Sequence, residues 1–200
     1  MDCTNEIKQY IENNFSEKRR IHTEGVRQTA IKLAEKYGAD SQKAETAALF
    51  HDMYRGVPEQ TLNYYVKHLG LDGKYINNAN LAHGKIAAIV MERDFDITDR
   101  DIINAVSYHT TGRAGMSTLE KVIYLADAIE PSRNYPGVDA LRKEAERDLD
   151  KACLMSLTST AEFVKSSGKY LDYDTILAKD DLEKIIDAKE KNKLEEKNDE

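Results

Sequence analysis

Six residues able to bind metal ions fall on the apolar faces of predicted helices. They are four of the five histidines and two aspartates: His22, His51, Asp52, His83, His109 and Asp127. Burying these polar side chains without partners would cost several kcal/mol, whereas metal ions would satisfy all of them together. The sequence therefore predicts a metal site inside the protein. His68 lies one position off its apolar face and is predicted at the surface.

The adjacent pair His51-Asp52 indicates how the metal ions are shared. Neighbouring residues in a helix point roughly 100° apart, so Asp52 can bridge from one metal ion to a second. Imidazole and carboxylate ligands together suit zinc, iron or manganese. Because six ligands exceed the four of a closed structural zinc site, the prediction is two metal ions with Asp52 between them. A single buried histidine is more often a core residue, so the prediction depends on the whole set.

The elements that hold these residues are all predicted to be helices. Apolar residues recur at helical spacing, and neither a strand pattern nor an internal repeat stands out. Thr98 with Asp101, and Ser117 with Glu120, have the spacing of capping boxes. The fold class is therefore predicted as all-α, a single-domain bundle of roughly eight to ten helices. Helices are predicted to begin near Thr4, Ser16, Asp40 or Ser41, Pro58, Ala79, Thr98, Ser117, Val138, Leu149 and Ile176.

The domain is predicted to span residues 1–188. From Lys189 to Glu200 the only apolar residue is Leu194, and lysine, glutamate, asparagine and aspartate make up the rest. Such a segment has too little apolar surface to bury, so 189–200 is predicted to be a disordered tail.

Composition limits which binding partners and which cellular compartment are expected for the protein. The net charge of −7 argues against a general nucleic-acid surface, so any anionic ligand must meet local positive charge. Cys3 and Cys153 are too few for a disulfide framework. No apolar run approaches the roughly 20 residues of a membrane span, and the polar N-terminus has no secretory signal. A cytoplasmic protein without nucleic-acid or membrane partners is predicted.

Three segments are similar to a known family: Tyr108 to Ser117, reading YHTTGRAGMS; Tyr124 to Asp127, reading YLAD; and Glu130 to Arg133, reading EPSR. With the order of the histidines and aspartates, they resemble the YqeK-type branch of the HD-domain superfamily of metal-dependent phosphohydrolases. The resemblance covers roughly residues 5 to 170. It implies a hydrolase that cleaves diadenosine tetraphosphate symmetrically to two ADP, by attack of a dimetal-bound hydroxide on a phosphate.

The resemblance also implies roles for individual residues. All six histidines and aspartates become ligands of two divalent metal ions, with iron favoured and manganese, cobalt or magnesium as alternatives. Asp52, Arg55 and Asp127 become catalytic residues. Arg55 stands where the family usually has a lysine, and Lys85 is given no role. The bound nucleotide is expected to be a dinucleoside polyphosphate.

Candidate substrate contacts come from residues near the predicted metal ligands. Arg133 and Arg113 offer planar forks for phosphate oxygens. Thr110 and Thr111 offer hydroxyl groups, and Tyr108 or Tyr135 offers a ring on which adenine can stack. Each of these residue types is also common at surfaces or in turns, so their roles are expectations about the site.

Three other functions remain open at this point. The first is an HD phosphohydrolase that acts on another nucleotide, and the second is a di-iron protein that uses oxygen. The third is a module that binds metal and nucleotide without turnover. A homodimer is compatible with the sequence.

Overall fold

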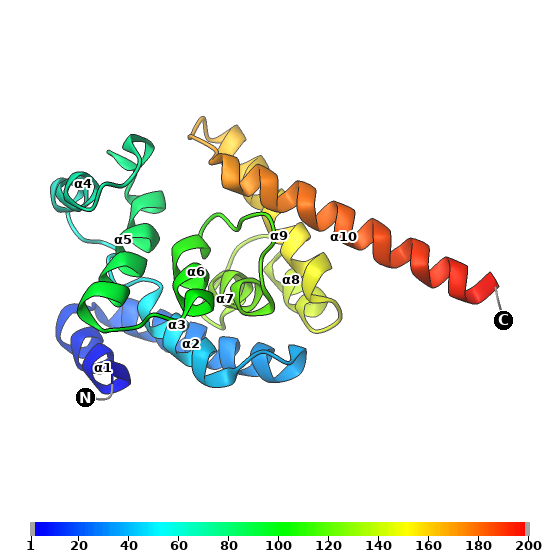
Figure 1. Cartoon of the computed structure of the whole chain (residues 1–200), viewed down its shortest axis with the longest axis horizontal. Helices are drawn as coiled ribbons and strands as arrows, with labels where there is room; N and C mark the ends of the chain where they lie inside the picture. Colours follow the sequence, from blue (N-terminus) through cyan, green and yellow to red (C-terminus); the bar gives the residue numbers. More distant parts are fainter. Residues whose placement is uncertain (1–2, 199–200) are drawn as a thin grey trace.

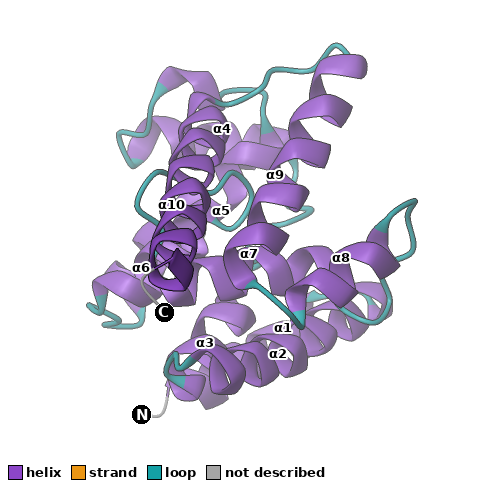
Figure 2. Cartoon of the chain, turned by 90° about the vertical axis from the view of Figure 1, so that its right-hand side faces the viewer, coloured by secondary structure: helices purple, strands orange, loops and turns teal. Residues whose placement is uncertain are grey.

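The computed structural model describes residues 3–198, and all regular structure in that range is helical (Figure 2). The expectation of an all-α bundle is therefore confirmed. The described residues form ten α-helices and one short 3-10 helix: α1 (Cys3–Asn14), α2 (Glu17–Tyr37), α3 (Ser41–Phe50), α4 (Glu59–His68), η1 (Gly73–Tyr75), α5 (Ala79–Asp94), α6 (Arg100–Tyr108), α7 (Thr118–Ile129), α8 (Val138–Ala145), α9 (Leu149–Ser166) and α10 (Tyr173–Asn198).

Local sequence signals set most helix ends. Asp40 caps α3, and Ser117 with Glu120 forms the predicted capping box of α7. Gly38 ends α2 with φ of 72°, a conformation that glycine adopts at little cost. The start of α6 differs from the prediction, because Asp99 rather than Thr98 is the N-cap. Its carboxylate accepts hydrogen bonds from two backbone N–H groups.

Helix α7 is the centre of the bundle. It contacts α2, α3, α6, α8 and α9, and its residues from Val122 to Ala126 are buried (Figure 1). Helix α2 packs against both α3 and α7, and α5 packs against α6. The helices that carry the six predicted ligands are thus neighbours, which brings residues distant in sequence to one interior region.

The C-terminal segment differs from the prediction. Helix α10 continues through Lys189 to Asn198, where the composition predicted disorder (Figure 1). Two ion pairs with α9 fix the first part of this segment: Lys189 lies 2.6 Å from Asp150, and Glu190 lies 2.7 Å from Lys151. Composition alone cannot reveal such long-range charge pairs, so it did not indicate this helix. Residues 199–200 of the predicted tail lie outside the described residues. The domain boundary at residue 188 stays a prediction.

Cys153 in α9 is a free, buried thiol, and burial raises its pKa far above the usual range. A thiol held in its neutral form is a poor nucleophile and a poor metal ligand. The side chain of Cys3 lies outside the described residues. Among residues 3–198, no helix combines the length and apolar character needed to cross a bilayer.

Candidate metal centre and active site

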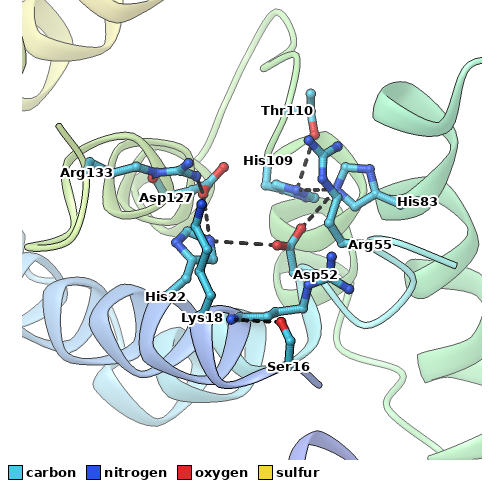
Figure 3. Close-up of a pocket in the computed structure, with 11 residues that line it drawn as sticks. Ser16, Lys18, His22, Asp52, Arg55, His83, His109, Thr110, Asp127 and Arg133 are labelled. Atoms are coloured by element: carbon cyan, nitrogen blue, oxygen red, sulfur yellow. Dashed lines mark hydrogen bonds and ion pairs between the residues drawn. The ribbon is translucent and has the colours of Figure 1, made fainter. Parts of the chain in front are cut away.

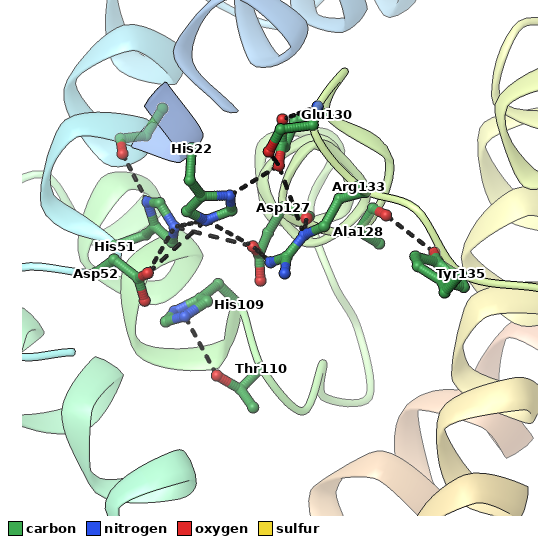
Figure 4. Close-up of polar contacts among 12 residues, drawn as sticks. His22, His51, Asp52, His109, Thr110, Asp127, Ala128, Glu130, Arg133 and Tyr135 are labelled. Carbon is green, nitrogen blue, oxygen red and sulfur yellow. Dashed lines mark hydrogen bonds and ion pairs between the residues drawn. The ribbon is translucent and has the colours of Figure 1, made fainter. Parts of the chain in front are cut away.

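The six predicted ligands converge on one interior point (Figures 3 and 4). His22 comes from α2, His83 from α5 and Asp127 from α7, while His51 and His109 occupy the C-terminal caps of α3 and α6. His51, His83 and His109 are at most 3% exposed. The structure therefore brings together residues that are as many as 105 positions apart in the sequence.

Asp52 divides the ligands into two sets. Its Oδ1 lies 3.2 Å from Nε2 of His83, which in turn lies 3.0 Å from Nε2 of His109. Its Oδ2 faces the other set, 3.7 Å from Nε2 of His22 and 3.8 Å from that of His51. Each set with Asp52 forms a group of nitrogen and oxygen atoms close enough to hold one metal ion. One carboxylate shared by both groups is the arrangement expected of a bridging ligand.

Asp127, the second aspartate, joins the set formed by His22 and His51. Oδ1 of Asp127 lies 3.1 Å from Nε2 of His22 and 4.0 Å from Nε2 of His51. Two ligand atoms about 2.1 Å from one metal ion and at right angles to each other are about 3.0 Å apart. The separations in both sets are therefore close to those of atoms that coordinate a common ion.

The hydrogen bonds of His83 and His109 test whether a cation fits. Nδ1 of His83 lies 3.1 Å from the carbonyl of Ala79, and Nδ1 of His109 lies 2.7 Å from that of Val106. A carbonyl only accepts, so in the neutral rings each Nδ1 carries the proton and each Nε2 presents a lone pair. Two lone pairs 3.0 Å apart repel each other. A metal cation bound by both nitrogens removes this repulsion, so the residues fit the ion.

The site also holds the protonation states that metal ligands need. Burial alone would raise the pKa of Asp52, but the nearby His51 and His83 lower it well below the usual range. Burial, together with the neighbouring histidines, lowers the pKa of His109 to about 3. The carboxylate is therefore ionised and the imidazole neutral at neutral pH.

A glycine permits the close approach of α5 and α6 beside the set formed by His83 and His109. A Cβ atom on Gly84 would lie 2.9 Å from the backbone oxygen of Val106 and 2.9 Å from Cε1 of His109. These separations are shorter than real Cβ contacts. His83 is therefore a candidate ligand, and the glycine that follows it leaves room for the ring of His109.

A cavity of about 420 Å³ opens above the predicted metal ligands. Arg133 approaches it from the side of Asp127, and Arg55 from the side of His83 (Figure 3). Arg133 makes an ion pair with Asp127 and also donates from Nε to its backbone carbonyl at 2.7 Å. The lining residues are Ser16, Lys18, Arg19, His22, Asp52, Arg55, His83, His109, Thr110, Asp127 and Arg133.

Three cations of this cavity have no carboxylate partner. Among the described side chains, none forms an ion pair with Lys18, Arg19 or Arg55. The guanidinium carbon of Arg19 instead lies 5.3 Å from the ring centroid of Phe15, and its guanidinium fills the space that a Cβ atom on Gly56 would need. In a chain with net charge −7, unpaired cations gathered at one cavity mark a place for an anion.

Only part of the predicted substrate set lines the cavity. Thr110 does, with its hydroxyl 3.2 Å from Nε2 of His109. Arg113 instead makes two hydrogen bonds to the buried carboxylate of Glu120, at 2.6 and 2.7 Å. Thr111 is buried and donates to the carbonyl of Gly112.

The two predicted stacking tyrosines also lie away from the cavity. The ring of Tyr108 has the ammonium of Lys85 3.2 Å from its centroid, and the guanidinium of Arg113 also lies over it. Tyr135 donates to the carbonyl of Ala128 and points away from the ligands (Figure 4). In the described part of the chain, no phenylalanine or tyrosine lines the cavity, so adenine stacking on Tyr108 or Tyr135 has no support.

Sequence reasoning missed Ser16, Lys18, Arg19 and Glu130. The first three belong to a polar run that the sequence presented as a helix start. Glu130 is 1% exposed, and its Oε1 lies 3.0 Å from Nδ1 of His22. The signal that could have found it is the EPSR segment itself, because a glutamate directly after an apolar helix is rarely buried without a partner.

Comparison with known proteins identifies the family. The profile of the HD domain matches residues 19–132, a range that contains all six predicted ligands. The chain belongs to the HD domain family. Membership implies divalent metal binding, and the histidine and aspartate clusters of this HD domain are able to provide it.

Individual relatives are similar in sequence to this protein over most of its length. A symmetrical bis(5'-nucleosyl)-tetraphosphatase from Bacillus subtilis is 42% identical, over 84% of this chain and 90% of the relative. One from Halalkalibacterium halodurans is 38% identical, over 84% and 90%. The crystal structure of a predicted HD superfamily hydrolase involved in NAD metabolism from Clostridium acetobutylicum superposes with a TM-score of 0.84. It is 43% identical and covers 89% of this chain and 95% of its own.

Proposed function

We propose that this HD domain hydrolyses dinucleoside tetraphosphates symmetrically, releasing two nucleoside diphosphates. The observation that carries the proposal is Asp52, whose two oxygens face two sets of imidazole nitrogens under a cavity with unpaired cations. The relatives named symmetrical bis(5'-nucleosyl)-tetraphosphatase support the choice of substrate and of the cleaved bond. The symmetrical products for diadenosine tetraphosphate are two molecules of ADP.

The proposed cofactor is a pair of divalent metal ions, with iron as the preferred identity. His22, His51 and Asp127 would hold one ion, His83 and His109 the other, and Asp52 both. Bound ions of this kind supply Lewis acidity and lower the pKa of water. Neutral imidazole with carboxylate suits iron as well as manganese and cobalt, so metal analysis of the purified protein decides between them.

The side chains of the cavity would bind and orient the polyphosphate. Arg55 and Arg19 offer planar forks that donate to phosphate oxygens, and Lys18 offers a compact ammonium group. Arg133 is held by Asp127, so it would orient this ligand and present its remaining N–H groups to the same phosphates. Thr110 would donate its hydroxyl to a phosphate oxygen. These contacts offset the repulsion between a tetraphosphate and a protein of net charge −7.

The leaving group requires little help from the protein. A nucleoside diphosphate is a stable anion, so the cations that bind its phosphates are sufficient to stabilise the charge that develops on it. The carboxylates of Asp52 and Asp127 stay ionised because neighbouring histidines lower their pKa values, and neither is in the protonated form of a general acid. We therefore assign these two aspartates to metal binding rather than to proton donation.

Turnover of diadenosine tetraphosphate by the metal-loaded protein tests the proposal. The native protein is expected to lose activity when the metal is chelated and to regain it when the metal is restored. Asp52→Ala removes the ligand common to both sets and is expected to abolish both metal binding and turnover. Normal activity of this variant would refute the bridging role.

A cytoplasmic location and a homodimer stay predictions. The free thiol of Cys153 agrees with a reducing compartment. Fractionation of cells and light scattering of the purified protein are the measurements that address them.

A further inference from the structure

One of the four histidine ligands is oriented differently from the other three. Nδ1 of His51 lies 2.7 Å from the carbonyl of Ala48, and His83 and His109 bind backbone carbonyls in the same way. In each case the carbonyl belongs to the preceding turn of the same segment, so the backbone orients the ring. Nδ1 of His22 instead faces a side chain, the carboxylate of Glu130 at 3.0 Å (Figure 4).

Glu130 is itself held rigidly. Its carboxylate accepts hydrogen bonds from the backbone N–H of Ser132 at 2.6 Å and from its hydroxyl at 2.5 Å. Arg142 fixes the same loop, because its guanidinium donates to the carbonyls of Ile129, Glu130 and Arg133, each at 2.9 Å. A buried carboxylate with these partners has one orientation, and it therefore transmits that orientation to His22.

Helix α2 has a glycine where Glu130 approaches it. Gly25 lies one turn after His22, and a Cβ atom there would be 2.6 Å from Oε2 of Glu130. Any larger residue would displace the carboxylate from the imidazole. The segment His22-Thr23-Glu24-Gly25 thus provides the ligand, His22, and at Gly25 the space for Glu130, which orients His22.

We propose that Glu130 is a positioning residue that controls one of the two metal positions. It holds the proton of His22 on Nδ1 and directs Nε2 toward Asp127 and Asp52, without touching any ligand of the other position. Outer-shell carboxylates of this kind orient metal-binding histidines, and their loss costs about 10- to 100-fold in metal affinity or activity. The proposal rests on the two metal positions of the proposed function.

The same carboxylate connects the metal position to the cavity. Oε1 of Glu130 lies 3.8 Å from Nε of Arg133, which binds both the side chain and the carbonyl of Asp127. His22 and Asp127, two ligands of one position, are therefore both oriented from the loop that follows α7. At the other position the backbone carbonyls of Ala79 and Val106 orient the rings of His83 and His109.

A titration of the metal-free protein with Mn²⁺, followed by calorimetry and electron paramagnetic resonance, tests this asymmetry. Glu130→Gln keeps the volume of the side chain and removes its charge. We expect one Mn²⁺ to bind about 10- to 100-fold more weakly, the other with native affinity, and the signal of a coupled pair to give way to that of a single ion. Ser132→Ala, which removes one restraint on Glu130, is expected to weaken the same position less.

Glu120→Gln is the matched control. Glu120 is also a buried glutamate of the α7 region, 2% exposed, but its carboxylate binds Arg113 rather than a metal ligand. It is expected to bind two Mn²⁺ ions with native affinities. The proposal is overturned if Glu130→Gln binds both ions normally, if it weakens both positions equally, or if Glu120→Gln has the same effect.

This test separates the proposal from the proposed function. Native protein that binds two Mn²⁺ ions but does not cleave dinucleoside tetraphosphates would refute the hydrolase assignment and leave the role of Glu130 standing. Native protein that binds a single Mn²⁺ ion would refute the proposal, because the unequal positions would not exist.

Discussion

The replacement of Gly84 by alanine tests the close packing behind His109. In an exposed helix this change stabilises by about 1 kcal/mol, because alanine has the higher helix propensity. Here the new methyl group meets the backbone oxygen of Val106 at 2.9 Å, and that oxygen also holds the ring of His109. Overpacking of this kind costs about 1–3 kcal/mol. The net expectation is a loss of up to about 2 kcal/mol in the free energy of unfolding.

Chemical denaturation of the metal-free protein measures this loss, and Mn²⁺ titration measures the site. Gly73→Ala is the control, since a Cβ atom on Gly73 meets nothing within 4 Å. We expect the control to stay within about 0.5 kcal/mol of the native protein. Gly84→Ala is expected to weaken the position of His83 and His109, the opposite position to that controlled by Glu130. A Gly84→Ala protein about 1 kcal/mol more stable, with unchanged metal binding, would show that α5 and α6 have room for the methyl group.

Two further predictions concern charges around the site. Arg19→Ala and Arg55→Ala are each expected to raise KM for diadenosine tetraphosphate about tenfold while two metal ions stay bound, because unpaired cations bind substrate phosphate. Arg147→Ala serves as the control, since Arg147 is exposed, lies outside the cavity and forms no ion pair with the described residues; an equal effect of all three variants would contradict the assignment. Burial lowers the pKa of Lys85 to about 8, so Lys85→Met is expected to stabilise the metal-free protein below pH 8. Between about pH 8 and 10.5 the unmutated protein keeps the Lys85 proton only in its unfolded state, so its stability rises with pH. The stability advantage of the variant therefore shrinks by at most about 3 kcal/mol over this range, and the contact between Lys85 and Tyr108 offsets part of that change. Denaturation at several pH values measures it, and a pH-independent advantage would show that Lys85 keeps an ordinary pKa.

The convergence of the candidate ligands could be predicted because these residues interrupt a regular pattern. His22, His83 and His109 sit at positions where helical spacing demands an apolar residue, and only a shared buried partner explains several such exceptions together. Helix ends such as Ser16 and Gly38 follow from capping preferences that act within one turn. Both kinds of signal are local, so one sequence is sufficient to read them.

The substrate contacts could not be predicted because they depend on competition between partners. The sequence favours Arg113 as a phosphate ligand, but in the structure its guanidinium binds Glu120, which the capping box of α7 holds in place. Lys18 and Arg19 looked like an ordinary charged helix start, and only the fold leaves them at the cavity without carboxylates. The role of Glu130 depends on a loop that returns to α2, 108 positions away from His22. The pairing of distant charges decides these cases.

Separation of the products of diadenosine tetraphosphate hydrolysis tests directly whether the protein cleaves this substrate symmetrically and with metal ions. The protein, loaded with iron under anaerobic conditions, is incubated with the substrate, and a chelated sample serves as the control. We expect ADP as the sole nucleotide product, and no product after chelation. AMP together with ATP would contradict symmetrical cleavage, and turnover that persists without metal would contradict the role of the histidine and aspartate clusters.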